Sequence, residues 1–327
     1  PVEYDAWDLE SWTRRHAVPL TTASPRDGDS VTVAVADGSP LVGSVVVTRR
    51  FGPSTATVTY RLLADCPTLM VDVDLDWHHS EHLLSMAFPL DVRADTASCD
   101  VQFGVVQRPT HPSSPWDAAK FEVCAHRFVD VSEPDFGVAV LNNGRYGHSV
   151  FDGAIRVSLA RAARYPDPAA DQGRHRVTLA VRPHGTGLGE VRAEAARLHA
   201  PVRHVAGPGG DSGGSDGRRR GPVVRVFDTD GTAAAGVAVD AVKTADDRSG
   251  DLVVRLHEHL GNRTTLSVVT PGRIIGAWRC NLLEEPEPGH VGEEVGDGAV
   301  TLTLRPFQLV TLRLRRTAAD DGRTWHA

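Results

Sequence analysis

The sequence predicts an all-β protein built from two sandwiches, a large one followed by a smaller one. Two patterns support this fold class. Short segments that alternate apolar and polar residues recur along most of the chain with polar turns between them, which is typical of antiparallel sandwiches. A stretch rich in glycine, serine and aspartate, 206–221, has almost nothing to bury and divides the strands into two groups.

The first group of strands begins with "SVTVAVADG" (30–38), which alternates and ends in a turn signal. Two more strands flank Gly52 and Pro53. One helix is predicted, "GEVRAEAARLHA" (189–200), which is alanine-rich and stops before Pro201, because the residue before a proline disfavours helical geometry. The other strands predicted for this group cover 66–77, 83–92, 99–107, 136–143, 154–162 and 174–183.

The alternation resumes after the glycine-rich stretch. The strands predicted there cover 223–227, 237–245, 251–261, 264–272 and 299–316. The last of them is interrupted at Pro306, which suits a sheet edge or a bend. We therefore expect a large sandwich over 1–205, a flexible linker over 206–221 and a small sandwich over 222–327.

Composition argues against several classes of function. The formal net charge is −7, and no concentrated basic face is present of the kind that nucleic acid or an anionic membrane requires. No apolar run approaches the ~20 residues of a membrane span. Cys66, Cys99, Cys124 and Cys280 form no C-x-x-C pair, which indicates reduced thiols in a cytoplasmic protein. The chain begins at Pro1 rather than Met, and we expect it to be a piece of a longer protein.

The segment "VDVDLDWHHSEHLLSMAFPL" (71–90) has the most polar strand and a cluster of histidines. Its aspartates at 72, 74 and 76 share one strand face, with neighbours ~7 Å apart, near the spacing of paired glycosidase carboxylates. Histidines at 78, 79 and 82 are of the type that binds zinc, but adjacent histidines on an extended chain point to opposite sides. A solvated strand face and turn is the favoured interpretation, ahead of a carboxylate pair or a metal site.

Two other motifs fail on spacing. "GHSVFDG" (147–153) has Phe151 where a nucleophile elbow needs its second glycine, and "GTGLGE" (185–190) lacks the G-x-G-x-x-G spacing of a phosphate loop. Two long polar loops, 107–128 and 165–176, combine prolines, aromatics and charges. Loops of this kind on a β scaffold tend to carry function.

These loops and several strands resemble the C-terminal β half of glycoside hydrolase family 38 α-mannosidases, closest to the bacterial and cytosolic branch. The resembling segments are 4–12, 51–62, 73–92, 103–133, 136–150, 165–175 and 300–315. The resemblance implies a supersandwich shared with galactose mutarotase, followed by a smaller β-sandwich. It also implies that 73–92 is a strand, a turn and a return strand of the sandwich.

The resemblance implies a function for the whole protein, a retaining exo-α-mannosidase that depends on zinc or another divalent metal. In this family the metal ligands and the nucleophilic aspartate belong to an N-terminal catalytic domain, and no residue here matches them. We therefore expect this chain to be non-catalytic and to hold no metal of its own. Its expected partners are the catalytic domain, whose pocket rim it would shape, and the α-mannoside; self-association through an uncovered interface is also expected.

The candidate rim residues lie in the loop "YPDPAADQGRH": Tyr165, Asp171, Gln172, Gly173 and His175. A rigid surface turn, with Asp171 capping backbone amides, is the alternative for this loop. Two other functions stay open. One is a free-standing carbohydrate-binding module, in which Trp7, Trp12, Trp116 and Tyr165 would stack on sugars. The other is a sugar epimerase, for which Glu122, His126 and His175 are the candidate acid and base.

Overall fold

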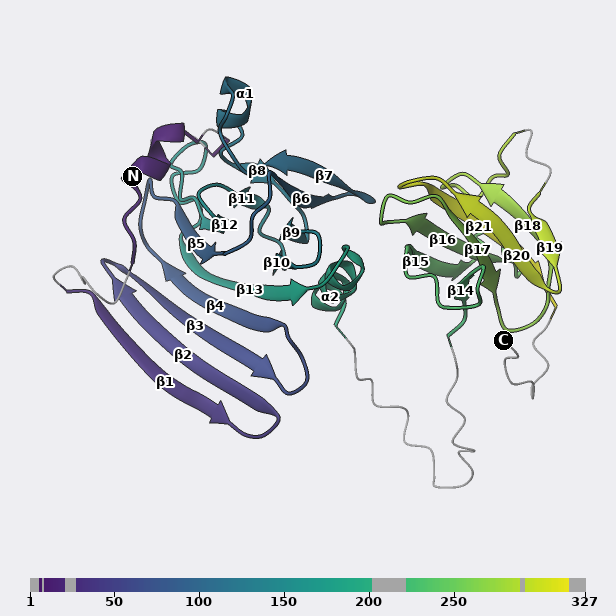
Figure 1. Cartoon of the computed structure of the whole chain (residues 1–327), viewed down its shortest axis with the longest axis horizontal. Coiled ribbons are helices and arrows are strands. Elements are labelled where there is room, and N and C mark those ends of the chain that lie inside the picture. Colours follow the sequence, from purple (N-terminus) through teal and green to yellow (C-terminus); the bar gives the residue numbers. More distant parts are fainter. Residues whose placement is uncertain (1–5, 8, 21–27, 202–221, 289–291, 318–327) are drawn as a thin grey trace. The chain divides into compact units, whose positions relative to one another are not determined.

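The computed structural model describes residues 6–7, 9–20, 28–201, 222–288 and 292–317, and the predicted linker at 206–221 lies outside them. The chain divides into two compact units, Pro1–Val202 and Arg203–Ala327 (Figure 1). Most of the described structure is antiparallel β-sheet, so the all-β prediction is confirmed.

A nine-stranded antiparallel sheet is the largest element of the first unit. Its order is β1-β2-β3-β4-β13-β10-β9-β6-β7. The strands are β1 (Ser30–Gly38), β2 (Val42–Phe51), β3 (Ser54–Leu63), β4 (Leu69–Trp77), β6 (Thr96–Val101), β7 (Gly104–Pro109), β9 (Phe128–Ser132), β10 (Gly137–Asn142) and β13 (Gly173–His184).

A four-stranded sheet packs against the inner face of the large one. It comprises, in spatial order, β5 (Leu84–Pro89), β12 (Ala154–Ala160), β11 (Gly147–Ser149) and β8 (Val123–Cys124). The alternate apolar residues of β4, from Val71 to Trp77, are buried in the core, together with Ile155 and Val157 of β12. The predicted strand, turn and strand of 73–92 are present, but β4 and β5 belong to opposite sheets.

The outer face of the large sheet carries the helix α2 (Gly189–His199), close to the predicted span and ending before Pro201. Val191 and Ala195 are fully buried and form a second core cluster with Leu141 of β10 and Ala180 of β13. Two short helices, η1 (Ser11–His16) and α1 (Pro115–Ala118), were not predicted. No described helix is long and apolar enough to cross a membrane.

The second unit consists of two four-stranded antiparallel sheets. One is ordered β14 (Arg225–Asp228), β17 (Thr264–Val269), β20 (Ala299–Leu304) and β19 (Glu294–Gly296). The other is ordered β15 (Val237–Thr244), β16 (Leu252–Glu258), β21 (Leu309–Arg316) and β18 (Ile274–Cys280). Leucines and valines from both sheets form its core. The stretch predicted as one strand, 299–316, is two strands in different sheets, with Pro306 in the turn between them.

Candidate functional site

The loop 161–172 leads from β12 in the small sheet to β13 in the large one, and it carries three of the five predicted rim residues. The other two, Gly173 and His175, lie at the start of β13. The loop therefore crosses from one layer of the sandwich to the other. The peptide bond between Tyr165 and Pro166 is cis. The carbonyl of Tyr165 accepts a hydrogen bond from the backbone N–H of Ala6 at 3.0 Å, so the N-terminal segment lies against this loop.

Asp171 holds the loop together from within. Its Oδ2 accepts the backbone N–H groups of Arg161 at 2.8 Å and Ala162 at 2.9 Å. Partial burial opposes ionisation, but these two bonds and the nearby His175 and Arg145 outweigh it and lower the pKa of the Asp171 carboxyl. The residue also adopts a left-handed backbone conformation, with φ of 60°, which aspartate tolerates better than most residues. These contacts match the capping alternative for Asp171.

His175, at the start of β13, reinforces the same turn. Its Nε2 lies 2.6 Å from the carbonyl oxygen of Asp171, and its Nδ1 lies 3.3 Å from an Nη2 of Arg145. A carbonyl only accepts and a guanidinium only donates, so Nε2 carries the proton and Nδ1 accepts. Both nitrogens are therefore engaged in holding the loop.

Of the other three candidate rim residues, two fix the position of the loop and one is exposed to solvent. Gln172 donates from Nε2 to the carbonyl of His79 at 2.8 Å, which ties the loop to the turn after β4. Gly173 has a φ of 98° and pairs with Trp77, so it begins β13 in a conformation that favours glycine. Tyr165 is 62% exposed, and its ring contacts that of Trp7 edge to face at 5.8 Å.

Two of the three alternating aspartates of β4 form cross-strand ion pairs. Arg61 of β3 donates to Asp72 from Nε at 3.0 Å, and Arg174 of β13 donates to Asp74 at 2.7 and 2.5 Å. The hydrogen bonds from Arg174 lower the pKa of Asp74, and with the charges of Arg174 and Arg176 they outweigh burial, which acts in the opposite direction. These carboxylates are acceptors for arginines on the outer sheet face, so the strand-face interpretation is confirmed.

The three histidines of the same segment have separate partners. His78 contacts Asp76 through Nε2 at 2.8 Å, His79 contacts Ser54 through Nδ1 at 2.8 Å, and His82 contacts the carbonyl of Ser80 at 2.6 Å. Partial burial lowers the pKa of His79, whose ring stacks on Phe51 and contacts the tilted ring of Trp77. Among the described residues, no three His, Cys, Asp or Glu side chains are grouped closely enough to hold a metal ion.

The residues suggested for epimerase chemistry are also used structurally. Glu122 accepts a 2.5 Å hydrogen bond from the Ser158 hydroxyl, and the His126 ring packs on Tyr146 with centroids 5.3 Å apart. His175 is held by Arg145 and the loop carbonyl, as described above. None of the three residues lines the hollow found beside Leu90 and Ala94.

Two buried ionic groups escaped the sequence analysis. Asp100, fully buried on β6, accepts from Arg127 at 2.9 and 3.1 Å and lies 3.6 Å from the buried Arg192 of α2. His184 contacts Asp130 through Nε2 at 2.7 Å and the carbonyl of Gly185 through Nδ1 at 2.8 Å. The charged partners in these groups are 27 to 92 residues apart in the sequence, so only a prediction of strand register could have brought them together.

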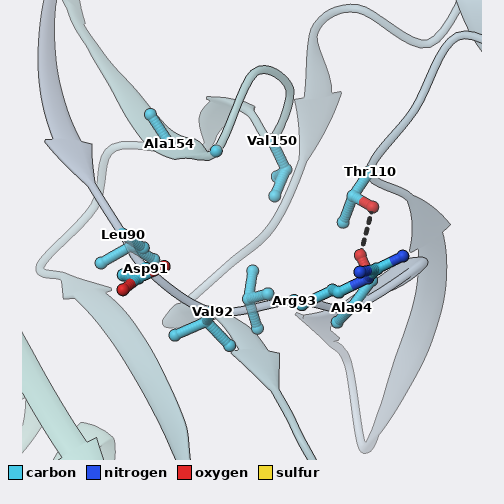
Figure 2. Close-up of a pocket in the computed structure, with 10 residues that line it drawn as sticks. Leu90, Asp91, Val92, Arg93, Ala94, Thr110, Val150 and Ala154 are labelled. Carbon is cyan, nitrogen blue, oxygen red and sulfur yellow. Dashed lines mark hydrogen bonds between the residues drawn. The ribbon is translucent and has the colours of Figure 1, made fainter.

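A shallow hollow of about 260 Å³ opens beside the segment between β5 and β6 (Figure 2). Leu90, Val92, Val150 and Ala154 give it an apolar lining, with charged side chains on the same segment. The hydroxyl of Thr110 is already used, since it donates to the carbonyl of Ala94 at 2.5 Å. None of the five predicted rim residues lines it.

Comparison with known proteins gives one consistent relationship. The family model described as "Glycosyl hydrolases family 38 C-terminal domain" matches residues 1–169. A second model, "Glycosyl hydrolases family 38 C-terminal beta sandwich domain", matches residues 236–312. The two matches fall in different units of the structure.

Three similar proteins are much longer than this chain. Alpha-mannosidase 2C1 of Mus musculus is 32% identical over 321 residues, which is 96% of this chain and 29% of that protein. The Homo sapiens protein of the same name is 33% identical over 322 residues, with the same coverage. A solved alpha-mannosidase from Enterococcus faecalis V583 has a TM-score of 0.69 at 18% identity over 88% of this chain and 35% of that chain, which shows a shared fold. The chain thus spans less than a third of the length of these curated relatives.

Proposed function

Because the chain belongs to glycosyl hydrolase family 38 and corresponds to the C-terminal part of its members, we propose that it is the non-catalytic, supporting portion of an α-mannosidase. The match to alpha-mannosidase 2C1 across 96% of the chain is the observation that carries the proposal. The complete protein would be a retaining exo-enzyme that hydrolyses terminal α-mannosides in the cytoplasm. Its metal, zinc or another divalent ion, and its catalytic carboxylates would belong to the preceding domain.

The contacts of the acidic residues support the non-catalytic role. A retaining glycosidase needs a nucleophilic carboxylate and an acid about 5–5.5 Å apart, both open to the sugar. Three of the carboxylates singled out in the sequence are instead held by other groups of the chain. Asp72 and Asp74 are bound to arginines, and Asp171 is bound to backbone amides. The four cysteines are all free, which suits a reducing cytoplasm.

We assign the loop 161–172 to the pocket rim of the complete protein. Asp171, Gln172 and His175 hold the loop in one conformation, and Gly173 permits its entry into β13. Tyr165 is left exposed, and an exposed aromatic ring offers a face on which a sugar ring stacks. In this assignment Tyr165 touches the substrate, while the other four residues position it.

The central test compares the complete protein with this chain. Both are incubated with an aryl α-mannoside, with added zinc and after chelation. We expect turnover by the complete protein, its loss on chelation and its return with zinc, and no turnover by the chain alone. Turnover by the chain alone at the rate of the complete protein would contradict the proposal.

The rim assignment has its own test in the complete protein. Tyr165→Ala is expected to lower kcat/KM at least ~10-fold, or ~1.4 kcal/mol of transition-state stabilisation, with an unchanged Tm. Trp116→Ala is the control, since Trp116 is 82% exposed and lies on the helix α1, outside the loop 161–172. Equal kinetics for Tyr165→Ala and wild type would remove Tyr165 from the rim.

A carbohydrate-binding module is the second candidate, favoured by the exposed pair of Trp7 and Tyr165. Titration of the chain with methyl α-mannoside in a calorimeter separates the two functions. The supporting role predicts no measurable binding without the catalytic domain. Binding that Trp7→Ala abolishes would favour the module instead.

A further inference from the structure

The two sheets of the first unit differ in width, and the apolar inner face of the large sheet continues past the small one. Strand register places Val73, Val58, Val47 and Val33 side by side across β4, β3, β2 and β1. The next row of that face is Val71, Tyr60, Val45 and Val35. Residues paired across neighbouring strands lie on the same face, so both rows extend the core.

Exposure rises steadily along these rows. In the first, Val73 is 3% exposed and Val33 is 64% exposed. In the second, the exposed fraction is 0% at Val71, 36% at Val45 and 76% at Val35. In Figure 1, β1 to β3 extend beyond the region occupied by β5, β11 and β12. The small sheet therefore covers these two rows of residues at β4 but leaves them exposed at β1.

The opposite face of the same strands carries polar residues, as expected for a face in contact with solvent. Its corresponding row is Thr32, Thr48, Thr57 and Asp74. A sheet with one solvated face reads as polar on that face and apolar on the buried one. The valines of β1 and β2 lie on the apolar face, although none of the residues that the structure describes covers them. Monomeric proteins rarely expose a contiguous apolar patch of this kind to water.

The edge of the small sheet adjoins this patch. Strand β5 pairs with β12 and, among the described residues, with no other strand. Its inward side chains Leu84, Met86 and Phe88 are only partly buried against the core. The N-terminal segment also arrives here, since Ala6 bonds to Tyr165 just beyond β12. The two alpha-mannosidase 2C1 relatives are more than three times as long as this chain, so the complete protein has further polypeptide that could pair with this edge.

We propose that a strand from the preceding region of the same polypeptide pairs with β5 and covers Val33, Val35, Val45 and Val47. The small sheet would thereby be extended over β1 to β3, and the β1–β3 face would be an internal interface of the complete protein. This inference rests on the proposed function, because it takes the preceding region to be the catalytic part of the same chain.

The test compares two variants in both proteins. Val35→Asp should lower the Tm of the complete protein by at least ~5 °C and leave the chain alone nearly unchanged, because the side chain is exposed only in the latter. Thr32→Asp, exposed on the opposite face of β1, is the control and should change neither. Hydrogen exchange should show alternate amides of β5, those not bonded to β12, protected in the complete protein and fast in the chain.

Two results would overturn the proposal. One is an equal, small effect of Val35→Asp in both proteins together with fast β5 amides in both. The other is a concentration-dependent dimer of the chain that Val35→Asp abolishes and that persists in the complete protein, which would assign the face to a second copy. Mannosidase activity is measured on the same samples to keep the two proposals apart. A complete protein that is inactive but has protected β5 amides would contradict the proposed mannosidase function and leave the proposed strand pairing intact.

Discussion

A fully buried histidine, His148 on β11, links the stability of the first unit to pH. Its Nδ1 donates to the carbonyl of Tyr146 at 3.0 Å, so the ring is neutral with Nε2 towards Asn142. Burial lowers the pKa of His148 to about 4, although the bond to Tyr146 acts in the opposite direction. The unfolded chain takes up this proton near pH 6.5, so protonation favours unfolding.

Stability should therefore be full above pH 6.5 and fall between pH 6.5 and about 4, by up to about 3 kcal/mol from this group. Urea unfolding at several pH values measures it, with His148→Gln as the comparison. His184 contributes with the opposite sign: burial lowers its pKa, but the bond and charge of Asp130 outweigh this and raise it. The difference in unfolding free energy between wild type and His148→Gln gives the contribution of His148 at each pH. If the two proteins had the same pH dependence of stability, His148 would not be the group responsible.

The carboxylate of Asp171 should matter for stability as well as for the rim. Asp171→Ala removes the acceptor of two backbone amides and places alanine at a positive φ, so we expect a loss of about 1–2 kcal/mol in this chain. Asp171→Asn keeps an acceptor and should cost less. Asp167→Ala, which removes a single local bond to the N–H of Ala169, is the matched control. Thermal unfolding that ranks the three alike would argue against this role.

At the scale of a strand, β10 depends on the absence of a side chain at Gly137. A Cβ there would overlap the Ser132 hydroxyl and lie 2.6 Å from Nε2 of His184. Those atoms surround the buried pair of His184 and Asp130, in which both ring nitrogens of the histidine donate to oxygen. Neither neighbour has room to move without breaking a hydrogen bond.

Gly137→Ala should therefore destabilise the first unit by about 2 kcal/mol or more. Gly43→Ala in β2 is the control, because a Cβ at Gly43 meets nothing within 4 Å, and it should be near neutral. Denaturant midpoints of the two variants measure the difference. Equal midpoints would show that Ser132 of β9 and His184 of β13 can shift to accommodate a methyl group at residue 137.

For the whole molecule, each unit has two sheets and its own apolar core. We expect the two pieces 1–205 and 222–327 to fold and to unfold cooperatively when they are produced separately. Each apolar core consists of side chains from its own unit. Calorimetry of the two pieces and of the intact chain measures this. A piece with no cooperative transition would contradict two independent units.

Residue spacing alone determined most of the strands and the helix at 189–200. The family came from the resemblance of whole segments, and strands such as β9 and β18 were not predicted. Alternation along a strand is a local property, and Val71, Val73 and Leu75 share a buried face whichever strands lie beside them. The stop before Pro201 is equally local. These features depend on neighbours within a few residues, and the structure confirms them.

Only the tertiary structure decided what the polar residues do. Asp74 meets Arg174 across 100 residues of sequence, and Asp171 finds the amides of Arg161 and Ala162 because the loop folds back on itself. The separation of β4 and β5 into opposite sheets, and the uncovered inner face of β1, follow from strand order. Pairing of distant strands is set by the register of the whole sheet, which no local pattern of residues specifies.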